Sequence, residues 1–236
     1  MNPFKVDILA IAAHPDDVEI SAGGTVAKQI SLGQKVAIVD LTQGELGSRG
    51  SAEIRKKEAQ SASEILGVHF RDNLQLKDGF FEYNESTLRL VIDQIRKYQP
   101  SIVLTNALRD RHPDHARGAK LVAEACFYSG LNKIVSEYNP WRPKAVYHFN
   151  QDFYNEPHFV VDVTDFWDIK MNSLKAYSSQ FFDPNSKEPQ TPISGKEFFD
   201  YLHARAMDFG RPANMLLAEG FQVARVPGVN DLMDLL

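Results

Sequence analysis

The 236-residue chain has almost no cysteine, no long apolar run and no excess of basic residues. Its one cysteine, Cys126, cannot form a disulfide within the chain, and it excludes a metal site built from several thiolates. Because no run of about 18 apolar residues occurs, we expect no membrane-spanning helix. The net charge of -5 disfavours a dedicated nucleic-acid-binding protein, which is usually basic. These absences predict a soluble protein with no nucleic-acid or membrane partner.

The first residues, MNPFKVD, also lack the charged start and apolar stretch of a secretory signal peptide. Together with the scarcity of cysteine, this favours a cytoplasmic location. What the chain does contain is ordinary for a globular domain, with 43% hydrophobic and 24% charged residues. A chain of this length can bury a substantial core without disulfides.

In the first half, short apolar runs alternate with segments of helical periodicity. Residues 6–13 are almost continuously apolar, which is typical of a strand covered on both faces. These patterns predict strands at 6–13, 35–41, 68–74 and 101–106, and helices at 18–32, 52–66, 86–98 and 113–127. Strands that alternate with helices pair in parallel through right-handed crossovers. We therefore predict an α/β, Rossmann-like, doubly wound and mainly parallel sheet, ordered 3-2-1-4-5, with helices on both faces.

Beyond Tyr138 the alternation is weaker. We expect strands at 145–149 and 159–163, helices at 165–177 and 196–209, and a polar, proline-marked loop at 182–189. No composition shift or linker marks a domain boundary. The chain is therefore predicted to be a single domain, in which residues 1–137 form the Rossmann-like core and residues 138–236 complete the domain and its substrate cleft.

Two short clusters carry the chemistry, residues 14–17 (HPDD) and residues 112–115 (HPDH). Each follows a predicted strand, and those two strands are neighbours in the predicted order. In doubly wound sheets a crevice opens at this point, outside the carboxyl ends of the strands. Taken singly, each cluster is typical of a helix N-terminus or a capped turn. Their expected juxtaposition predicts one site.

The residue types in that site favour zinc. Catalytic zinc commonly takes three nitrogen or oxygen ligands and leaves one position for water, and His14, Asp17 and His115 provide such a set. Asp16 is then placed to act as general base, because zinc lowers the pKa of its bound water to roughly 7. His112 lies one helical turn before His115. If protonated, it stabilises an oxyanion or protonates a leaving amine, and Asp114 would orient it and keep it charged.

Residues 13–19 (AHPDDVE) and 112–115 (HPDH) resemble the PIG-L/LmbE-like superfamily of zinc-dependent N-deacetylases. The similarity extends through residues 44–50, Arg55 and residues 181–189, and it is closest to the bacillithiol-biosynthesis deacetylases. The resemblance implies a Rossmann-like fold, one zinc per chain, a homo-hexamer, and N-acetylglucosaminyl-malate as the small-molecule substrate. For the two clusters, the resemblance implies the roles given above. His14, Asp17 and His115 match the metal ligands, Asp16 matches the general base, and His112 matches the stabilising histidine with Asp114 as its partner.

Arg55 and Arg111 match family positions that line the substrate cleft. Malate carries two carboxylates, and arginine binds a carboxylate through paired hydrogen bonds. Arg55 also lies in the charged stretch 53–58, where a merely solvated side chain is the alternative. The glycine-rich segment 44–50 either shapes the sugar pocket or forms a flexible connection. No site residue is assigned to the C-terminal third.

Other functions stay open at this stage. One is a broader amino-sugar N-deacetylase. Another is a metal-dependent, glycosyltransferase-like enzyme in which Asp16 and Asp17 hold the ion of a nucleotide sugar, although magnesium and manganese prefer oxygen ligands to histidine. A non-catalytic binding module is a third, but segment 44–50 lacks the spacing and the lysine of a phosphate-binding loop. A His/Asp/His site also accepts iron(II), cobalt(II) or nickel(II).

Overall fold

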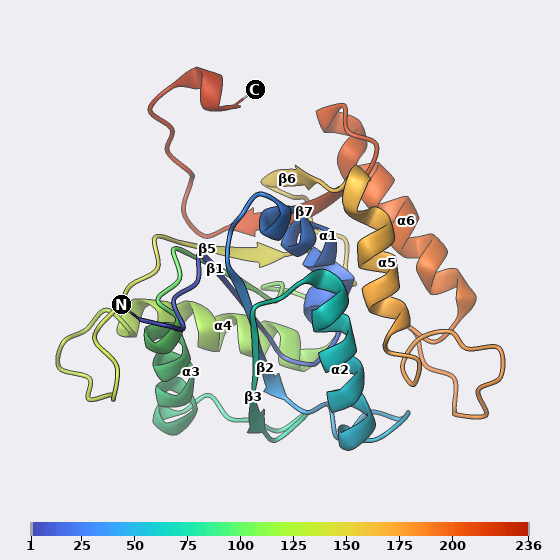
Figure 1. The fold of residues 1–236 in the computed structure, drawn as a ribbon, viewed down its shortest axis with the longest axis horizontal. Helices are drawn as coiled ribbons and strands as arrows, with labels where there is room; N and C mark the ends of the chain where they lie inside the picture. Colours follow the sequence, from blue (N-terminus) through green and yellow to red (C-terminus); the bar gives the residue numbers. More distant parts are fainter. Residues whose placement is uncertain (1, 236) are drawn as a thin grey trace.

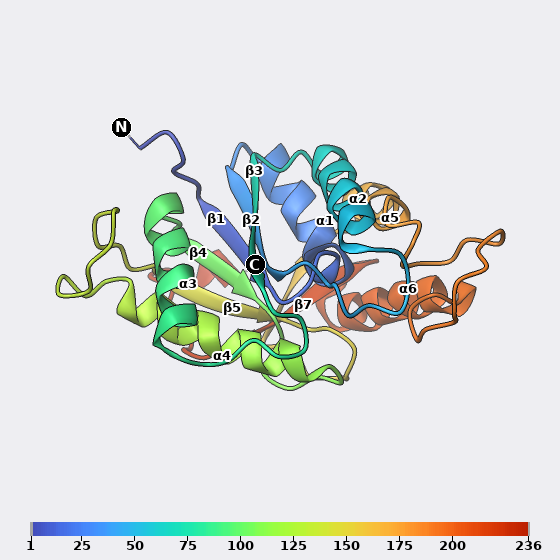
Figure 2. The ribbon, with the colours of Figure 1, turned by 90° about the horizontal axis from the view of Figure 1, so that it is seen from below.

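The computed structural model describes residues 2–235, and its strands form one seven-stranded sheet with helices on both faces (Figures 1 and 2). The strands are β1 (Ile8–Ala12), β2 (Val36–Thr42), β3 (Phe70–Leu76), β4 (Ile102–Thr105), β5 (Ala145–Phe149), β6 (Phe159–Asp162) and β7 (Ala218–Val223). The α-helices are α1 (Asp17–Ser31), α2 (Ala52–Leu66), α3 (Glu85–Tyr98), α4 (Pro113–Tyr128), α5 (Trp167–Lys175) and α6 (Lys196–Gly210). Short 3-10 turns are η1 (Thr164–Phe166), η2 (Arg211–Ala213) and η3 (Leu232–Leu235).

The strand order is β3-β2-β1-β4-β5-β7-β6, and the first five strands are parallel. The predicted order 3-2-1-4-5 is confirmed. Strand β7 was not predicted from the sequence, and it pairs antiparallel with both β5 and β6. The sheet therefore includes strands from both the N-terminal and the C-terminal part of the chain.

Side chains on the central strands pack into a separate core on each face of the sheet, because successive residues of a strand point to opposite sides. On one face, Leu9 and Ile11 of β1 pack with residues of α3 and α4. On the other, Ala10 and Ala12 pack against α1. A third cluster joins α2, α5 and α6. This double coverage explains why β1 and β2 are buried along their whole length.

Helices α2 and α3 begin at polar capping residues, and α2 ends at a glycine. Gly67, with a φ of 79°, adopts the left-handed conformation that ends α2. Ser51 accepts a hydrogen bond from the Ile54 N–H at the start of α2, and Asn84 begins α3 with a capping box. Among the described residues, no helix is both long enough and apolar enough to cross a membrane.

Candidate active site

The two histidine-aspartate clusters meet where β1 and β4 end. These strands are parallel neighbours, with Ile11 opposite Thr105, so the segments that follow them leave the sheet at the same edge. Residues 14–17 form the turn from β1 into α1, and residues 106–112 lead from β4 into α4. His112 is the N-cap of α4 and Pro113 occupies its first turn. The predicted juxtaposition is confirmed.

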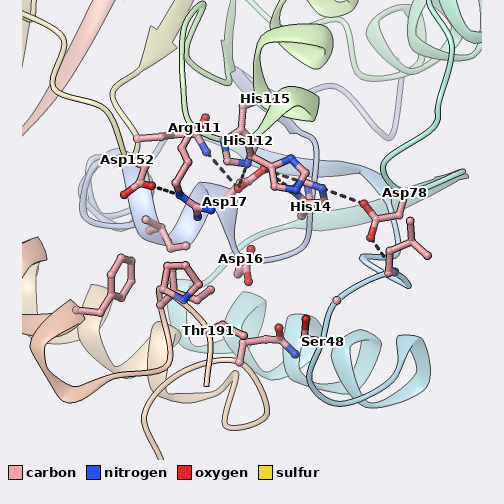
Figure 3. Close-up of a pocket in the computed structure, with 18 of the residues that line it drawn as sticks. His14, Asp16, Asp17, Ser48, Asp78, Arg111, His112, His115, Asp152 and Thr191 are labelled. Atoms are coloured by element: carbon pink, nitrogen blue, oxygen red, sulfur yellow. Dashed lines mark hydrogen bonds and ion pairs between the residues drawn. The ribbon is translucent and has the colours of Figure 1, made fainter. Parts of the chain in front are cut away.

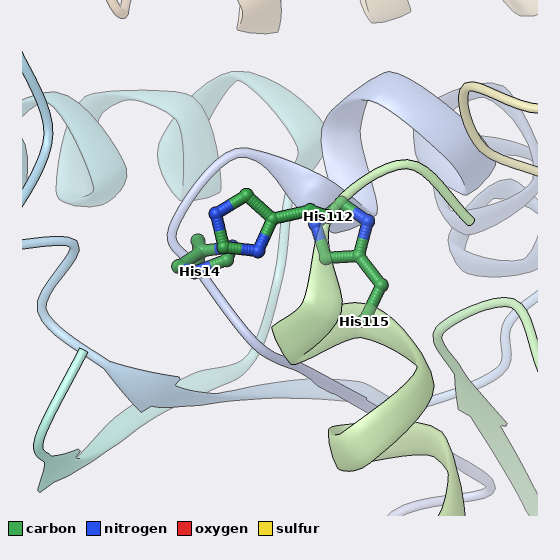
Figure 4. A group of neighbouring side chains, drawn as sticks. All are labelled: His14, His112 and His115. Atoms are coloured by element: carbon green, nitrogen blue, oxygen red, sulfur yellow. The ribbon is translucent and has the colours of Figure 1, made fainter. Parts of the chain in front are cut away.

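The carboxylate of Asp17 lies between two histidine rings (Figure 3). Its Oδ2 is 3.5 Å from Nδ1 of His14, and its Oδ1 is 3.1 Å from Nε2 of His115. The ring of His112 packs against both, with centroids 4.6 Å from His14 and 5.1 Å from His115 (Figure 4). The structure thus brings together the three predicted ligands and the predicted stabilising histidine.

Each of the two histidines beside Asp17 has an acidic partner on its other ring nitrogen. Nε2 of His14 is 3.1 Å from Asp78 Oδ1, and Nδ1 of His115 is 2.5 Å from Asp110 Oδ2. Metal-binding histidines commonly donate their second N–H to a carboxylate in this way, which fixes the tautomer. The arrangement leaves Nδ1 of His14 and Nε2 of His115 as lone-pair donors directed at Asp17.

The electrostatics favour positive charge at this point. Burial lowers the pKa of His14, but hydrogen bonds to Asp114, Asp17 and Asp78 outweigh it and raise the pKa well above its usual value. For His115, burial is likewise outweighed by Asp17 and Asp110, and the pKa rises to about 9. Burial raises the pKa of Asp17, yet the two histidines hold it well below its usual range. Such a site stabilises a cation, whether a proton or a metal ion.

His112 differs from the other two histidines in its hydrogen bonding. Its Nδ1 accepts the backbone N–H of Asp114 at 3.2 Å, so that nitrogen carries the lone pair. A neutral ring then has its proton on Nε2, which makes it a donor and not a metal ligand. Burial, with the nearby His14 and His115, lowers the pKa of His112. One ring nitrogen of His112 nevertheless lies within 4.8 Å of a ring nitrogen of His14 and of one of His115.

The structure corrects the expected contact of Asp114. Its carboxylate does not touch the His112 ring. Instead, Oδ2 accepts the Gly79 N–H at 2.8 Å and lies 3.5 Å from Nε2 of His14, while Oδ1 accepts from Arg117 at 2.7 Å. Asp114 therefore supports His14, and only its backbone N–H orients His112. The negative charge of Asp114 still opposes the fall in the pKa of His112, but burial, His14 and His115 outweigh it. The expectation that Asp114 keeps His112 charged therefore stays a prediction.

Two amide side chains fix the orientation of Asp17. Asn106 donates to Oδ2 at 3.0 Å and Gln151 donates to Oδ1 at 3.1 Å. Gln151 Oε1 in turn accepts from Asn106 and from the backbone N–H of Ala107. Because the donors reach both oxygens, the carboxylate cannot rotate without losing hydrogen bonds. The network joins the ends of β1, β4 and β5.

Asp16 has the strained backbone often found at functional positions. Its φ of 113° lies in the left-handed region, which few residues other than glycine, asparagine and aspartate adopt. The side chain is buried, and its carboxylate has no hydrogen-bond partner in residues 2–235. Burial raises its pKa to about 7, with Arg55 opposing the rise and Asp17 adding to it. A carboxyl group with this pKa can accept a proton near neutral pH.

Arg55 is buried, which contradicts the alternative of a solvated side chain. Its guanidinium donates to Gln180 and lies against the glycine segment. A Cβ on Gly44, whose φ is 65°, would meet Arg55 Nη1 at 1.9 Å, and one on Gly47 would meet Nη2 at 3.0 Å. These glycines make room for Arg55, so the segment shapes the pocket through this side chain.

These groups line one cavity of about 350 Å³, a volume typical of small-molecule sites. Arg111 lies at its mouth and is paired with Asp152 (Figure 3). The wall opposite the histidines comes from the C-terminal third, to which no residue was assigned from the sequence. It includes Ile193, Phe198 and Tyr201.

Sequence reasoning missed several supporting residues. Asp110 lies two residues before the second cluster, and Gln151 follows β5 at the same sheet edge, so strand position was an available signal for both. Asp78 lies in the β3–α3 connection. Its Oδ2 accepts the Leu46 N–H, and its own N–H donates to Glu45, which links His14 to the glycine segment. No local pattern marks Asp78.

Comparison with known proteins agrees with this geometry. A family model described as PIG-L, GlcNAc-PI de-N-acetylase, matches residues 9–126, which include both clusters. The diacetylchitobiose deacetylase of Thermococcus kodakarensis is 28% identical over 94% of this chain and 84% of its own length. A probable N-acetyl-alpha-D-glucosaminyl L-malate deacetylase 2 of Bacillus subtilis is 24% identical over 75% of this chain and 84% of its own length.

A solved structure extends the likeness to three dimensions. The crystal structure of a conserved protein from Thermus thermophilus superposes with a TM-score of 0.86 at 32% identity, covering 96% of this chain and 98% of that one. The fold and the site define an enzyme of the metal-dependent N-deacetylase class. The chain belongs to the PIG-L family.

Proposed function

We propose that this chain is a zinc-dependent hydrolase that removes the acetyl group from the nitrogen of an N-acetylglucosaminide. The observation that carries the proposal is the convergence of His14 Nδ1 and His115 Nε2 on the carboxylate of Asp17. Two imidazoles and one carboxylate are a common ligand set of catalytic zinc. A magnesium-dependent transferase is disfavoured because magnesium prefers sites composed of oxygen atoms.

The residues present fit a zinc ion. His14, Asp17 and His115 would hold it, while Asp78 and Asp110 fix the tautomers of the two histidines. When bound, such an ion supplies Lewis acidity toward the amide carbonyl and toward water.

The remaining steps belong to side chains of this protein. Asp16, which has no competing hydrogen bond, takes a proton from the attacking water. At the same time the water oxygen bonds to the acetyl carbon. His112 donates its Nε2–H to the carbonyl oxygen while negative charge develops there. The C–N bond then breaks, and the proton held by Asp16 passes to the departing nitrogen. The products are acetate and a free amine.

For the substrate, we propose N-acetylglucosaminyl-malate, which yields glucosaminyl-malate. Support comes from Arg55 and Arg111, which line the cavity, and from the name of the Bacillus subtilis relative. The name of the Thermococcus relative favours a second candidate, a broader amino-sugar N-deacetylase that accepts other aglycones. The apolar wall at Ile193 and Phe198 is compatible with either.

The test is acetate release from a panel of N-acetylglucosaminides with different aglycones, alongside metal analysis of the purified protein. We expect about one zinc per chain, loss of activity with a chelator and recovery on adding zinc. Turnover of the malate conjugate alone supports the specific substrate, and broad turnover supports the second candidate. No turnover of any panel member by the zinc-loaded protein overturns the proposal. The homo-hexamer implied by resemblance stays a prediction for analytical ultracentrifugation.

A further inference from the structure

An ion pair at the mouth of the cavity holds Arg111 by one side only. Nε of Arg111 donates to Oδ2 of Asp152, which lies in the segment after β5 (Figure 3). The terminal nitrogens of Arg111 have no hydrogen-bond partner in residues 2–235, and both side chains line the cavity. A guanidinium offers donors along two edges. With Asp152 at the Nε side, the terminal Nη1–Nη2 edge remains for a ligand.

This ion pair contributes little to folding. The side chains are 44% and 33% exposed, and ion pairs with this much solvent contact add little to stability. The backbone of Asp152, in contrast, is held firmly. Its N–H donates to Asp110 Oδ1 at 2.9 Å, and its carbonyl accepts from the Tyr201 hydroxyl at 2.7 Å.

The same anchoring connects the mouth to the metal-binding end. Asp110 uses Oδ1 for the backbone of Asp152 and Oδ2 for the ring of His115. The carboxylate of Asp152 therefore projects from a backbone whose position is set by a ligand-supporting residue. Through Asp152, Arg111 is held at a defined position relative to His115.

We propose that Asp152 is a specificity-determining positioning residue. It holds Arg111 from the side so that the terminal edge of the guanidinium binds a carboxylate on the aglycone of the substrate. Paired hydrogen bonds from that edge match the geometry of a carboxylate. The inference rests on the proposed function and deepens it, because it assigns the recognition of an anionic aglycone to the Arg111–Asp152 pair.

The test compares two substrates that differ only in charge, N-acetylglucosaminyl-malate and its diamide. Asp152→Ala keeps every backbone hydrogen bond of residue 152 and removes the one side-chain partner of Arg111. It also removes a negative charge that acts at longer range on Arg205, an effect common to both substrates. We expect it to raise KM for the malate conjugate about tenfold, since hydrogen bonds to charged groups are of that strength. The KM of the diamide and kcat for both substrates should change less than about twofold.

Two further variants sharpen this test. Asp152→Asn retains an acceptor for Nε and should restore most of the lost affinity for the malate conjugate. Arg111→Met should abolish the preference for the malate conjugate over the diamide. Adding Asp152→Ala to Arg111→Met should have no further effect on that preference. Zinc content is measured for each protein, and we expect it to stay at the wild-type level.

Equal KM changes for both substrates in Asp152→Ala, or a fall in kcat together with zinc loss, would show a purely structural role and overturn the inference. Wild-type enzyme that turns over malate conjugate and diamide equally well would overturn it as well. Failure to hydrolyse either conjugate is a different result, because it refutes the proposed substrate class itself.

Discussion

The floor and the rim of the cavity are built in different ways. At the floor, the side chains of His14, Asp17 and His115 are only 9%, 3% and 11% exposed, and each has several polar partners. At the rim, Leu46 is 59% exposed and Arg111 has one ion-pair partner. The floor residues lie in the turn after β1 and in the first turns of α1 and α4, whereas Leu46 and Arg111 lie in loops.

This contrast indicates which residues determine the chemistry and which determine the choice of substrate. A buried side chain with several hydrogen bonds keeps one geometry, which catalysis and metal binding require. An exposed side chain with one partner can change without disturbing the fold. Substitutions at the floor should therefore alter chemistry or metal affinity, and substitutions at the rim should alter only the choice of substrate.

The largest effect is expected from Asp16→Asn. Loss of the proposed general base should lower kcat by about 10²–10⁴-fold. Zinc should be retained because Asp16 contacts neither histidine in the hydrogen bonds described. Asparagine tolerates the left-handed backbone at this position, so the fold should be unchanged. Acetate release and zinc content are measured on the same sample. Near-normal turnover by a zinc-loaded variant would rule out Asp16 as the base.

The second prediction concerns the unequal support of His14 and His115 and its effect on zinc affinity. Besides the shared Asp17, His115 has one carboxylate partner, Asp110, whereas His14 is near both Asp78 and Asp114. Asp110→Asn should weaken zinc affinity by about 10–100-fold, because it places an amide donor against the donating nitrogen of His115. Asp78→Asn should cost less, since Asp114 remains.

Competition with a chromogenic chelator gives both affinities, and circular dichroism checks the fold. Equal losses in the two variants would show that the number of carboxylates around a histidine does not control metal affinity. A larger loss in Asp78→Asn would reverse the assignment of the principal supporting residue.

A third effect concerns pH. The pKa of Asp16 is raised to about 7, and the positive charge of Arg55 opposes this rise. As the proposed base, Asp16 would work only as a carboxylate, so we expect activity to be lost as pH falls through its pKa. Arg55→Met removes the stabilising cation and should move the acidic limb of kcat/KM upward by roughly one pH unit. The exposed neighbour Lys56 provides the control, because Lys56→Met should leave the limb in place. An unmoved limb in Arg55→Met would refute the electrostatic link.

The smallest effect is expected at Leu46. This side chain is 59% exposed, while its backbone N–H still donates to Asp78 in any variant. Leu46→Ala should change KM by less than about threefold and leave kcat, zinc content and Tm unchanged, as expected for exposed positions. Steady-state kinetics and a thermal melt are sufficient. Loss of zinc in this variant would mean that the rim is not independent of the floor.

The main features of the floor could be predicted from the sequence because its signals are local. An apolar run at residues 6–13, glycine stops and regular helices determine the parallel order, and the order places the ends of β1 and β4 together. The two clusters lie at those ends. Apolar periodicity and strand adjacency were therefore enough to bring together His14, Asp17 and His115.

The supporting contacts could not be predicted in the same way. Asp78 reaches His14 across 64 residues and no local pattern marks it. Gln151 reaches Asp17 across 134 residues, and its only signal is its position just after β5. Strand β7 was missed because its sequence, AEGFQV, mixes polar and apolar residues. Its Glu219 is buried, where it accepts the N–H groups of Gly24 and Thr25 in α1. Long-range polar pairing of this kind leaves no periodic trace in the sequence.

Anomalous diffraction at the zinc edge, from crystals of the zinc-loaded protein, would locate the proposed metal site directly. We predict one principal peak, bonded to Nδ1 of His14, a carboxylate oxygen of Asp17 and Nε2 of His115, with zinc–ligand distances of about 2.0–2.2 Å. A principal peak on the other side of His14, between its Nε2, Asp78 and Asp114, or no peak near Asp17, would contradict the proposed ligand set.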